Sequence, residues 1–253
     1  MIPVTKPHLP EIGRYISYIE RCYENNQLTN NGPLAQELKA RLEEYLGVQN
    51  LLLVANGTLA LQIAYKALGV SGKAITTPFT FVATSSSLKW EGIEPVYADI
   101  DAQSLDLCPE KVLEAIDPEV TALVPVHVYG NPCDVEAFDR IAKNHDLKVI
   151  YDAAHAFGVR LNGKSILLWG DAATLSFHAT KVFHTVEGGA VVVALVHLEE
   201  VGRHGLAEQP VKGFPYHRFG LRSTGLIGVG RVAQHSQDSA LRQAPECYQV
   251  RCA

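Results

Sequence analysis

The sequence has little that would place this 253-residue chain in a membrane or on nucleic acid. No window approaches the roughly 20 consecutive apolar residues of a membrane-spanning helix. The N-terminus lacks the apolar stretch of a secretory signal peptide. The net charge of −5 gives no reason to expect nucleic acid as a partner. We therefore expect a cytoplasmic protein that needs neither a membrane nor nucleic acid.

Cysteine is also sparse. The five cysteines are odd in number and scattered, without a CxxC pair, at Cys22, Cys108, Cys133, Cys247 and Cys252. This spacing favours reduced cytosolic thiols over a disulfide framework or a zinc site. No cluster of His, Cys and Asp has the spacing of metal ligands, so we expect no metal site.

Apolar sequence, in contrast, is plentiful: 47% of the residues are hydrophobic, and they fall in short runs. The runs cover residues 51–55, 74–77, 95–98, 122–126, 148–151, 173–177 and 190–195. Helical patterns separate several of them, at 33–46, 58–68, 82–90, 109–116 and 134–145. Nearly continuous apolar strands that alternate with helices predict an α/β domain in three layers, α/β/α. Its seven-stranded sheet should be mainly parallel.

The last sixty residues differ from the rest. Residues 1–193 hold ten Lys and five Arg, whereas residues 194–253 hold one Lys and six Arg. After about Leu206, Gly, His, Gln and Arg are dispersed without a helical or strand period. We predict a large domain with an N-terminal arm at 1–195 and a divergent, weakly structured tail at 196–253.

Lys181 carries the clearest chemical signal. It ends the segment Ser-Phe-His-Ala-Thr-Lys, before Glu187-Gly188-Gly189, and lies between two apolar runs. A lysine held between apolar strands loses hydration, which lowers its pKa and frees the amine as a nucleophile. Amine nucleophiles attack carbonyl groups to form Schiff bases, the chemistry of enzymes that use pyridoxal phosphate (PLP).

Two strand ends could contribute to a PLP site, and each has a plainer interpretation. Asn56-Gly57-Thr58 ends one strand and opens a helix, so its amides and hydroxyl could bind a phosphate. Alternatively, it is an ordinary turn that Thr58 caps. Asp152 ends another strand, where α/β sheets bind ligands, and could pair with the pyridine nitrogen. Alternatively, it caps a turn.

Three further side chains could also contribute to a PLP site. Phe81 could stack on a cofactor ring or pack in the core, and His155 could bond the ring oxygen or serve the structure. The Ser176 hydroxyl could reach the same phosphate as Thr58. Each signal is weak alone, but their order on successive strand ends favours one cofactor site.

At these residues the chain resembles the DegT/DnrJ/StrS-type sugar-nucleotide aminotransferases, which have the fold-type I architecture. The resemblance runs from about Ile2 to Val193. It is carried by the segments at 28–33, 56–61, 75–84, 125–130 and 152–156 and by SFHATK with its following EGG. The sequences of these motifs look most similar to those of enzymes that aminate C4 of dTDP-4-keto-6-deoxy-D-glucose.

The resemblance implies a role for each residue. Lys181 would form the Schiff base with PLP and later shuttle a proton. The cofactor would be held by Asp152 at the pyridinium, Phe81 on the ring, His155 near the ring oxygen, and Gly57, Thr58 and Ser176 at the phosphate. L-glutamate would donate the amine to a dTDP-keto-sugar for surface polysaccharide such as O-antigen. The enzyme would be a homodimer, and Lys181 argues against the family's dehydratase branch, where a histidine replaces it.

After Val193 the resemblance stops, and we expect the family's small C-terminal domain to be largely missing. A shifted reading frame or a premature stop is our hypothesis for this. The alternative function is a truncated, catalytically inactive or regulatory PLP-fold protein. A second alternative is a nucleotide-binding module built on Gly225, Gly228 and Gly230, but their order is GxxGxG rather than GxGxxG and no strand precedes them.

Overall fold

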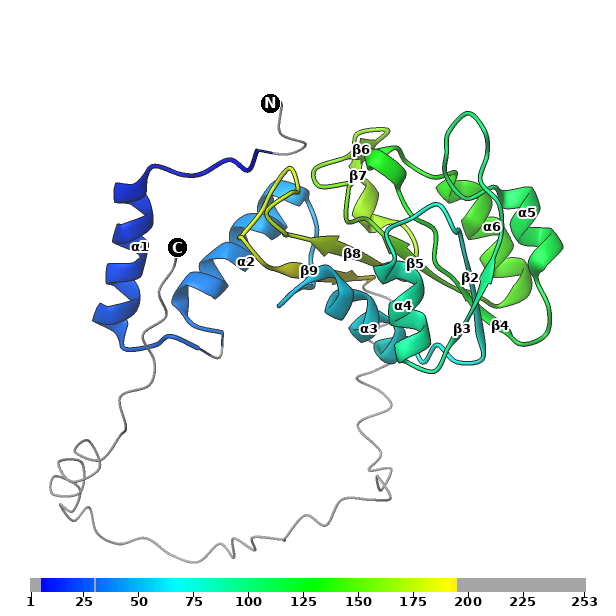
Figure 1. Ribbon diagram of the computed structural model, residues 1–253, viewed down its shortest axis with the longest axis horizontal. Helices are drawn as coiled ribbons and strands as arrows, with labels where there is room; N and C mark the ends of the chain where they lie inside the picture. Colours follow the sequence, from blue (N-terminus) through cyan, green and yellow to red (C-terminus); the bar gives the residue numbers. More distant parts are fainter. Residues whose placement is uncertain (1–5, 30, 195–253) are drawn as a thin grey trace, which may run out of the picture. The chain divides into compact units, whose positions relative to one another are not determined.

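A computed structural model describes residues 6–29 and 31–194 of the chain (Figure 1). Its main sheet has seven strands in the order β1-β9-β8-β5-β4-β2-β3. These strands are β1 (Leu51–Val54), β2 (Lys73–Thr76), β3 (Glu94–Tyr97), β4 (Val120–Leu123), β5 (Lys148–Asp152), β8 (Ala172–Ser176) and β9 (Gly189–Val193). All seven predicted strands are present, within two residues of the expected positions at their N-terminal ends.

The sheet is mainly parallel, as predicted. Only β9 runs against its neighbours, β1 on one side and β8 on the other. The remaining pairs, from β8 through β5, β4 and β2 to β3, are parallel. The six strands other than β9 therefore end at the same edge, and their following loops can meet there.

Helices cover both faces of this sheet. They are α2 (Pro33–Leu46), α3 (Gly57–Ala67), α4 (Ala83–Trp90), α5 (Pro109–Ala115) and α6 (Val135–His145), close to the predicted ranges. Helices α3 and α4 share one buried cluster with Ile150, while α2, α5 and α6 share another with Val149 and Tyr151. Successive residues of β5 thus face opposite cores, which explains why its three central residues are all apolar. The predicted three-layer arrangement is confirmed.

Three elements were not predicted. Helix α1 (Ile12–Asn25) precedes α2, and strands β6 (Arg160–Leu161) and β7 (Lys164–Ser165) form a small hairpin. The hairpin turn is Asn162-Gly163, where both φ angles are positive, at 50° and 79°. An Asn-Gly pair is the usual signal for such a turn and could have been read from the sequence.

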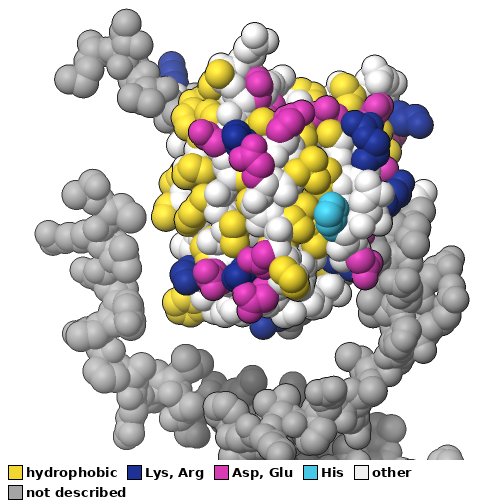
Figure 2. All heavy atoms as spheres, turned by 90° about the vertical axis from the view of Figure 1, so that its right-hand side faces the viewer, with side chains coloured by type: hydrophobic (Ala, Val, Ile, Leu, Met, Phe, Trp, Pro, Cys, Tyr) yellow, Lys and Arg dark blue, Asp and Glu magenta, His cyan; other side chains and the backbone are white. Residues whose placement is uncertain are grey.

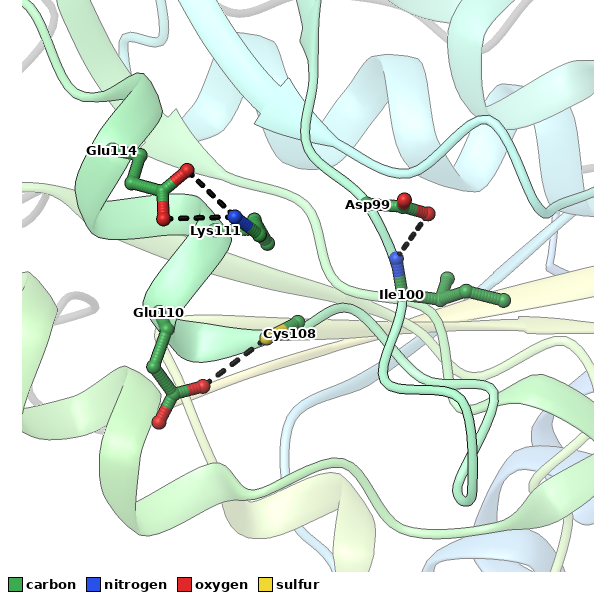
Figure 3. Close-up of polar contacts among 6 residues, drawn as sticks. All are labelled: Asp99, Ile100, Cys108, Glu110, Lys111 and Glu114. Atoms are coloured by element: carbon green, nitrogen blue, oxygen red, sulfur yellow. Dashed lines mark hydrogen bonds and ion pairs between the residues drawn. The ribbon is translucent and has the colours of Figure 1, made fainter.

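One of the cysteines, Cys108, lies directly before α5 and contacts a glutamate in its first turn. The Cys108 thiol donates to Glu110 Oε2 at 3.1 Å, and Lys111 bonds Glu114 one turn further on (Figure 3). The cysteines within the described residues are all free thiols, as predicted: Cys22, Cys108 and Cys133. The other two cysteines lie outside those residues.

The surface drawn in Figure 2 mixes acidic and basic side chains among apolar ones, without separating them by sign. Within residues 6–29 and 31–194, no helix is both long and apolar enough to cross a membrane. The predicted tail at 196–253, including the glycines at 225–230, lies outside the described residues. The predicted domain boundary at 195/196 therefore stays a prediction.

Candidate active site

One cavity of about 330 Å³ opens where the chain leaves β1, β5 and β8. All seven residues proposed from the sequence line it: Gly57, Thr58, Phe81, Asp152, His155, Ser176 and Lys181. Parallel strands bring their C-terminal ends to one edge of the sheet, so residues more than 120 positions apart in sequence meet here. The structure brings the predicted set together, and the role of each residue stays a prediction.

The first wall is the N-terminus of α3. Asn56 caps this helix, since its side-chain oxygen accepts the Leu59 N–H at 2.8 Å. The alternative that Thr58 is the cap is therefore wrong, and Thr58 lies in the first turn instead. A Cβ at Gly57 would lie only 2.9 Å from the Ser176 Cβ. Glycine is thus required for α3 to approach the end of β8, and the start of the helix, where amides lack partners within the helix, lines the cavity.

Asp152 forms the floor of the cavity at the end of β5, and only 6% of it is exposed. Its Oδ1 accepts the Ala154 N–H at 3.1 Å, so the predicted turn-capping alternative holds for this oxygen. Its Oδ2 accepts a second hydrogen bond, from the Thr84 hydroxyl at 2.8 Å. The carboxylate is therefore fixed by two donors from different parts of the chain while it faces the cavity.

Lys181 lies in the loop between β8 and β9 and is half-buried in the same cavity. Burial lowers the pKa of its ammonium group, and the charge of Asp152 offsets part of that effect. With the carboxylates of residues 6–29 and 31–194, Lys181 makes no ion pair within 4.0 Å. The desolvation predicted from the apolar flanks is thus present, and it favours an uncharged, nucleophilic amine.

Phe81 and His155 bring aromatic rings to the cavity. Phe81 is 72% exposed, so the alternative that it packs in the core is wrong. Tyr129 stacks on His155 with ring centroids 6.2 Å apart, and Phe79 meets Tyr129 edge-on at 6.4 Å. Burial lowers the pKa of His155, Lys181 lowers it further, and Asp152 raises it. The net lowering favours the neutral form of the His155 imidazole.

Two other histidines in the loop that carries Lys181 make local polar contacts. His178 Nδ1 lies 2.8 Å from the Thr180 hydroxyl, and its Nε2 lies 3.6 Å from a Glu187 carboxylate oxygen. His184 Nε2 lies 2.7 Å from the backbone oxygen of His8. These contacts order the loop that carries Lys181.

Sequence reasoning missed Thr84, although the segment at 75–84 was singled out. The residue lies in the first turn of α4 and is fully buried against Asp152. Its hydroxyl also lies 2.8 Å from that of Thr80, four residues earlier. Two threonines at this helical spacing, directly after a strand, were the available signal.

Comparison with known proteins agrees with this geometry. Residues 11–217 match the DegT/DnrJ/EryC1/StrS aminotransferase family, beyond Val193, where the sequence analysis ended the resemblance. The dTDP-4-amino-4,6-dideoxy-D-glucose transaminase of Shigella dysenteriae is 52% identical over 197 residues, 78% of this chain and 54% of the relative. The Escherichia coli protein of the same name is 48% identical, over 66% of this chain and 45% of the relative. The chain spans about half the length of these relatives.

Solved structures also match the fold of this chain. The structure of DesI in the presence of its TDP-sugar product superposes with a TM-score of 0.75 at 36% identity, over 79% of this chain and 51% of that one. The PLP form of a putative sugar aminotransferase from Streptococcus pneumoniae superposes with a TM-score of 0.71 at 26% identity, over 76% of this chain and 53% of that one. That relative is also known in a pyridoxamine phosphate (PMP) form. With its fold, its cavity and these matches, the chain belongs to the DegT/DnrJ/EryC1/StrS family of PLP-dependent aminotransferases.

Proposed function

We propose that this chain is an aminotransferase that uses PLP to move an amino group from L-glutamate to a nucleotide-linked keto-sugar of the dTDP-4-keto-6-deoxyhexose type. One observation carries the proposal: a half-buried lysine of lowered pKa shares a cavity with a buried carboxylate and a glycine-lined helix N-terminus. The product would serve surface polysaccharide synthesis, such as that of O-antigen, and the enzyme would act in the cytoplasm.

The phosphate end of PLP fits the wall made by α3 and β8. The absence of a side chain at Gly57 leaves its amide and that of Thr58 accessible from the cavity. Backbone amides at a helix N-terminus attract anions because the helix dipole is positive there. The Ser176 hydroxyl adjoins them and can donate a further hydrogen bond.

The ring of PLP fits the other walls. The Asp152 carboxylate can accept a hydrogen bond from a protonated pyridine nitrogen, and its low exposure strengthens that pairing. The exposed Phe81 ring offers an apolar surface for stacking, and His155 offers a ring nitrogen to an oxygen substituent. When bound, PLP supplies an electron sink for bond changes at the substrate carbon.

The residues of the chain then divide the remaining work. Because its pKa is lowered, Lys181 Nζ is uncharged more often at neutral pH than an exposed lysine, so it can attack a carbonyl carbon. The same nitrogen can later accept a proton from the amine-bearing carbon and return it, as a general base and acid. A neutral His155 adds no positive charge beside that nitrogen.

The substrate assignment draws on relatives. Two transaminases named for dTDP-4-amino-4,6-dideoxy-D-glucose share 52% and 48% identity with this chain, against 34% for a GDP-perosamine synthase of Vibrio cholerae. The higher identity to the dTDP-sugar enzymes supports a dTDP-keto-sugar as the acceptor. L-glutamate is the donor that the family resemblance implies.

The experiment tests cofactor attachment and amine transfer separately. Purified protein with PLP should give an absorbance that borohydride bleaches, and mass spectrometry of the peptides should find PLP fixed on Lys181. An assay with L-glutamate and dTDP-4-keto-6-deoxyglucose should then yield the amino sugar. Lys181→Ala should abolish both results, whereas Lys164→Ala, at an exposed lysine of β7, should change neither.

The outcomes separate the alternatives. Failure of PLP to attach to Lys181 would sink the proposal. Attachment without amine transfer to any dTDP- or GDP-keto-sugar would favour the alternative of a catalytically inactive or regulatory PLP-fold protein. Transfer to a GDP-keto-sugar alone would replace the proposed acceptor and leave the reaction type standing.

A homodimer is part of the proposal. Helix α1 exposes a row of apolar side chains, each at least 42% accessible: Ile12, Tyr15, Ile16, Ile19 and Tyr23. Their helical spacing is that of a face that packs against another surface, and a second copy of the chain would cover it. Light scattering should therefore report a dimer that Ile16→Lys weakens and Ser17→Lys, at a polar exposed position of the same helix, does not. A monomer at micromolar concentration would contradict this part.

A further inference from the structure

A short chain of hydroxyl groups stands behind the carboxylate at the floor of the cavity. The Thr84 hydroxyl donates to Asp152 Oδ2 at 2.8 Å, and the Thr80 hydroxyl lies 2.8 Å from that of Thr84. Thr84 is completely inaccessible to solvent, so water cannot substitute for either contact. A buried polar side chain with these partners is strongly constrained.

The donors and acceptors fix the direction of the chain. A hydroxyl group has one proton, and Thr84 uses it toward Asp152. The Thr84 oxygen can then only accept from Thr80, so the order is Thr80 to Thr84 to Asp152. Donation from Thr80 polarises the Thr84 O–H bond and strengthens the contact with the carboxylate.

Both oxygens of the carboxylate are held, and they are held from different elements. Thr84 belongs to α4, while the Ala154 N–H that reaches Oδ1 belongs to the turn after β5. Two donors at two oxygens fix the plane of the carboxylate, which a single contact would leave free to rotate. The Thr84 backbone oxygen in turn accepts from the Ser87 hydroxyl at 3.2 Å, which secures the first turn of α4.

We propose that Thr84, supported by Thr80, is a positioning residue that holds the Asp152 carboxylate in the orientation needed to receive the pyridine nitrogen of PLP. This inference rests on the proposed function for its purpose. Its physical content, the orientation of Asp152, belongs to the protein alone. A hydrogen-bond acceptor that is already oriented binds its partner without first giving up rotational freedom.

Two substitutions isolate the hydroxyl. Thr84→Val removes the donor and keeps the branched shape, and Thr84→Ser keeps the donor. The matched control is Thr76→Val, because Thr76 is equally buried but its hydroxyl donates to the Val124 backbone oxygen, away from Asp152. A merely structural role for Thr84 would make its valine variant behave like the control.

The first measurement needs no cofactor. Crystal structures of the PLP-free protein should show the Asp152 carboxylate rotated or disordered in Thr84→Val and unmoved in Thr84→Ser and Thr76→Val. An unmoved carboxylate in Thr84→Val would overturn the inference, whatever the protein does with PLP. If the valine variant does not fold, Thr84→Ala, which also lacks the hydroxyl donor, takes its place in the same comparison.

The second measurement is the dissociation constant of PLP, from titration of its absorbance. We expect Thr84→Val to weaken binding about tenfold and Thr80→Val less, with Thr84→Ser and Thr76→Val near the wild type. Equal loss in Thr84→Val and Thr76→Val would overturn the inference. A rotated carboxylate in a protein whose wild type binds no PLP would instead overturn the proposed function and leave the positioning of Asp152 established.

Discussion

Lys73 lies where a strand of the sheet begins, and Lys181 lies just after another strand ends. Their surroundings shift the pKa of the same chemical group in opposite directions. Lys73 begins β2, and its ammonium contacts Asp117 Oδ2 at 2.8 Å and Glu119 Oε2 at 2.6 Å. Those two carboxylates raise the pKa of Lys73. Lys181 follows β8 at the C-terminal ends of the parallel strands, where burial lowers its pKa.

Burial alone does not separate the two residues. The Lys73 side chain is only 21% exposed, so it too has lost much of its water. The difference lies in what replaced that water: two carboxylates near Lys73, and largely uncharged groups near Lys181. A lysine paired with carboxylates is held as a cation, whereas a desolvated lysine without an ion pair to the described carboxylates is available as a nucleophile.

The largest expected effect is a difference in reactivity. At pH 7.5, Lys181 should react with an amine-acylating reagent at least about tenfold faster than Lys73, since each unit of pKa changes the uncharged fraction tenfold. The rates are read from peptide masses over time in the PLP-free protein. Equal rates would remove the basis of the comparison.

Removing the carboxylates near Lys73 should reduce the difference in labelling rate between the two lysines. The double substitution Asp117→Asn and Glu119→Gln should speed labelling of Lys73 several-fold, to within about tenfold of Lys181, because the charges that hold its proton are gone. The control is Asp139→Asn, which frees Lys143 at a surface ion pair of 2.6 Å. No change in Lys73 labelling would show that the Asp117 and Glu119 contacts do not hold its proton in solution.

Asp152→Asn should increase the difference in labelling rate between Lys181 and Lys73. The carboxylate raises the pKa of Lys181 against the effect of burial, so its loss should lower that pKa and speed labelling about two- to fivefold. The amide oxygen can still accept from Thr84, but the amide nitrogen cannot accept the Ala154 N–H, so circular dichroism should first verify that the fold is retained. PLP affinity should fall in the same variant, and slower labelling would contradict the assigned electrostatics.

The smallest effect concerns His155. The charge of Lys181 lowers the pKa of this imidazole, so Lys181→Met should raise it. A proton NMR titration of the histidine ring follows the change, with Lys164→Met as the control. The imidazole should then gain its proton at a higher pH than in the wild type, and a downward shift would contradict the arrangement.

The sequence predicted the sheet well because every strand contains consecutive apolar residues, as Leu51–Val54 and Gly189–Val193 illustrate. It also placed the candidate site, because parallel strands put Asp152 and Ser176 at one edge. It could not predict the bond from Thr84 to Asp152, because 68 positions separate them and the spacing of Thr80 and Thr84 does not identify the partner. Helix α1 was predictable from its apolar spacing and was missed.

The reversed strand β9 has a consequence for the order of folding. Strand β1 joins the described sheet only through β9, and its Val54 pairs with Gly189, 135 residues further along the chain. Contacts between such distant residues form slowly, because a long loop must close first. During synthesis the helix that begins at Gly57 is made early, yet it meets Ser176 only after most of the chain has left the ribosome. The contact between α3 and the end of β8, which forms one wall of the cavity, is therefore among the last parts of the described fold to form.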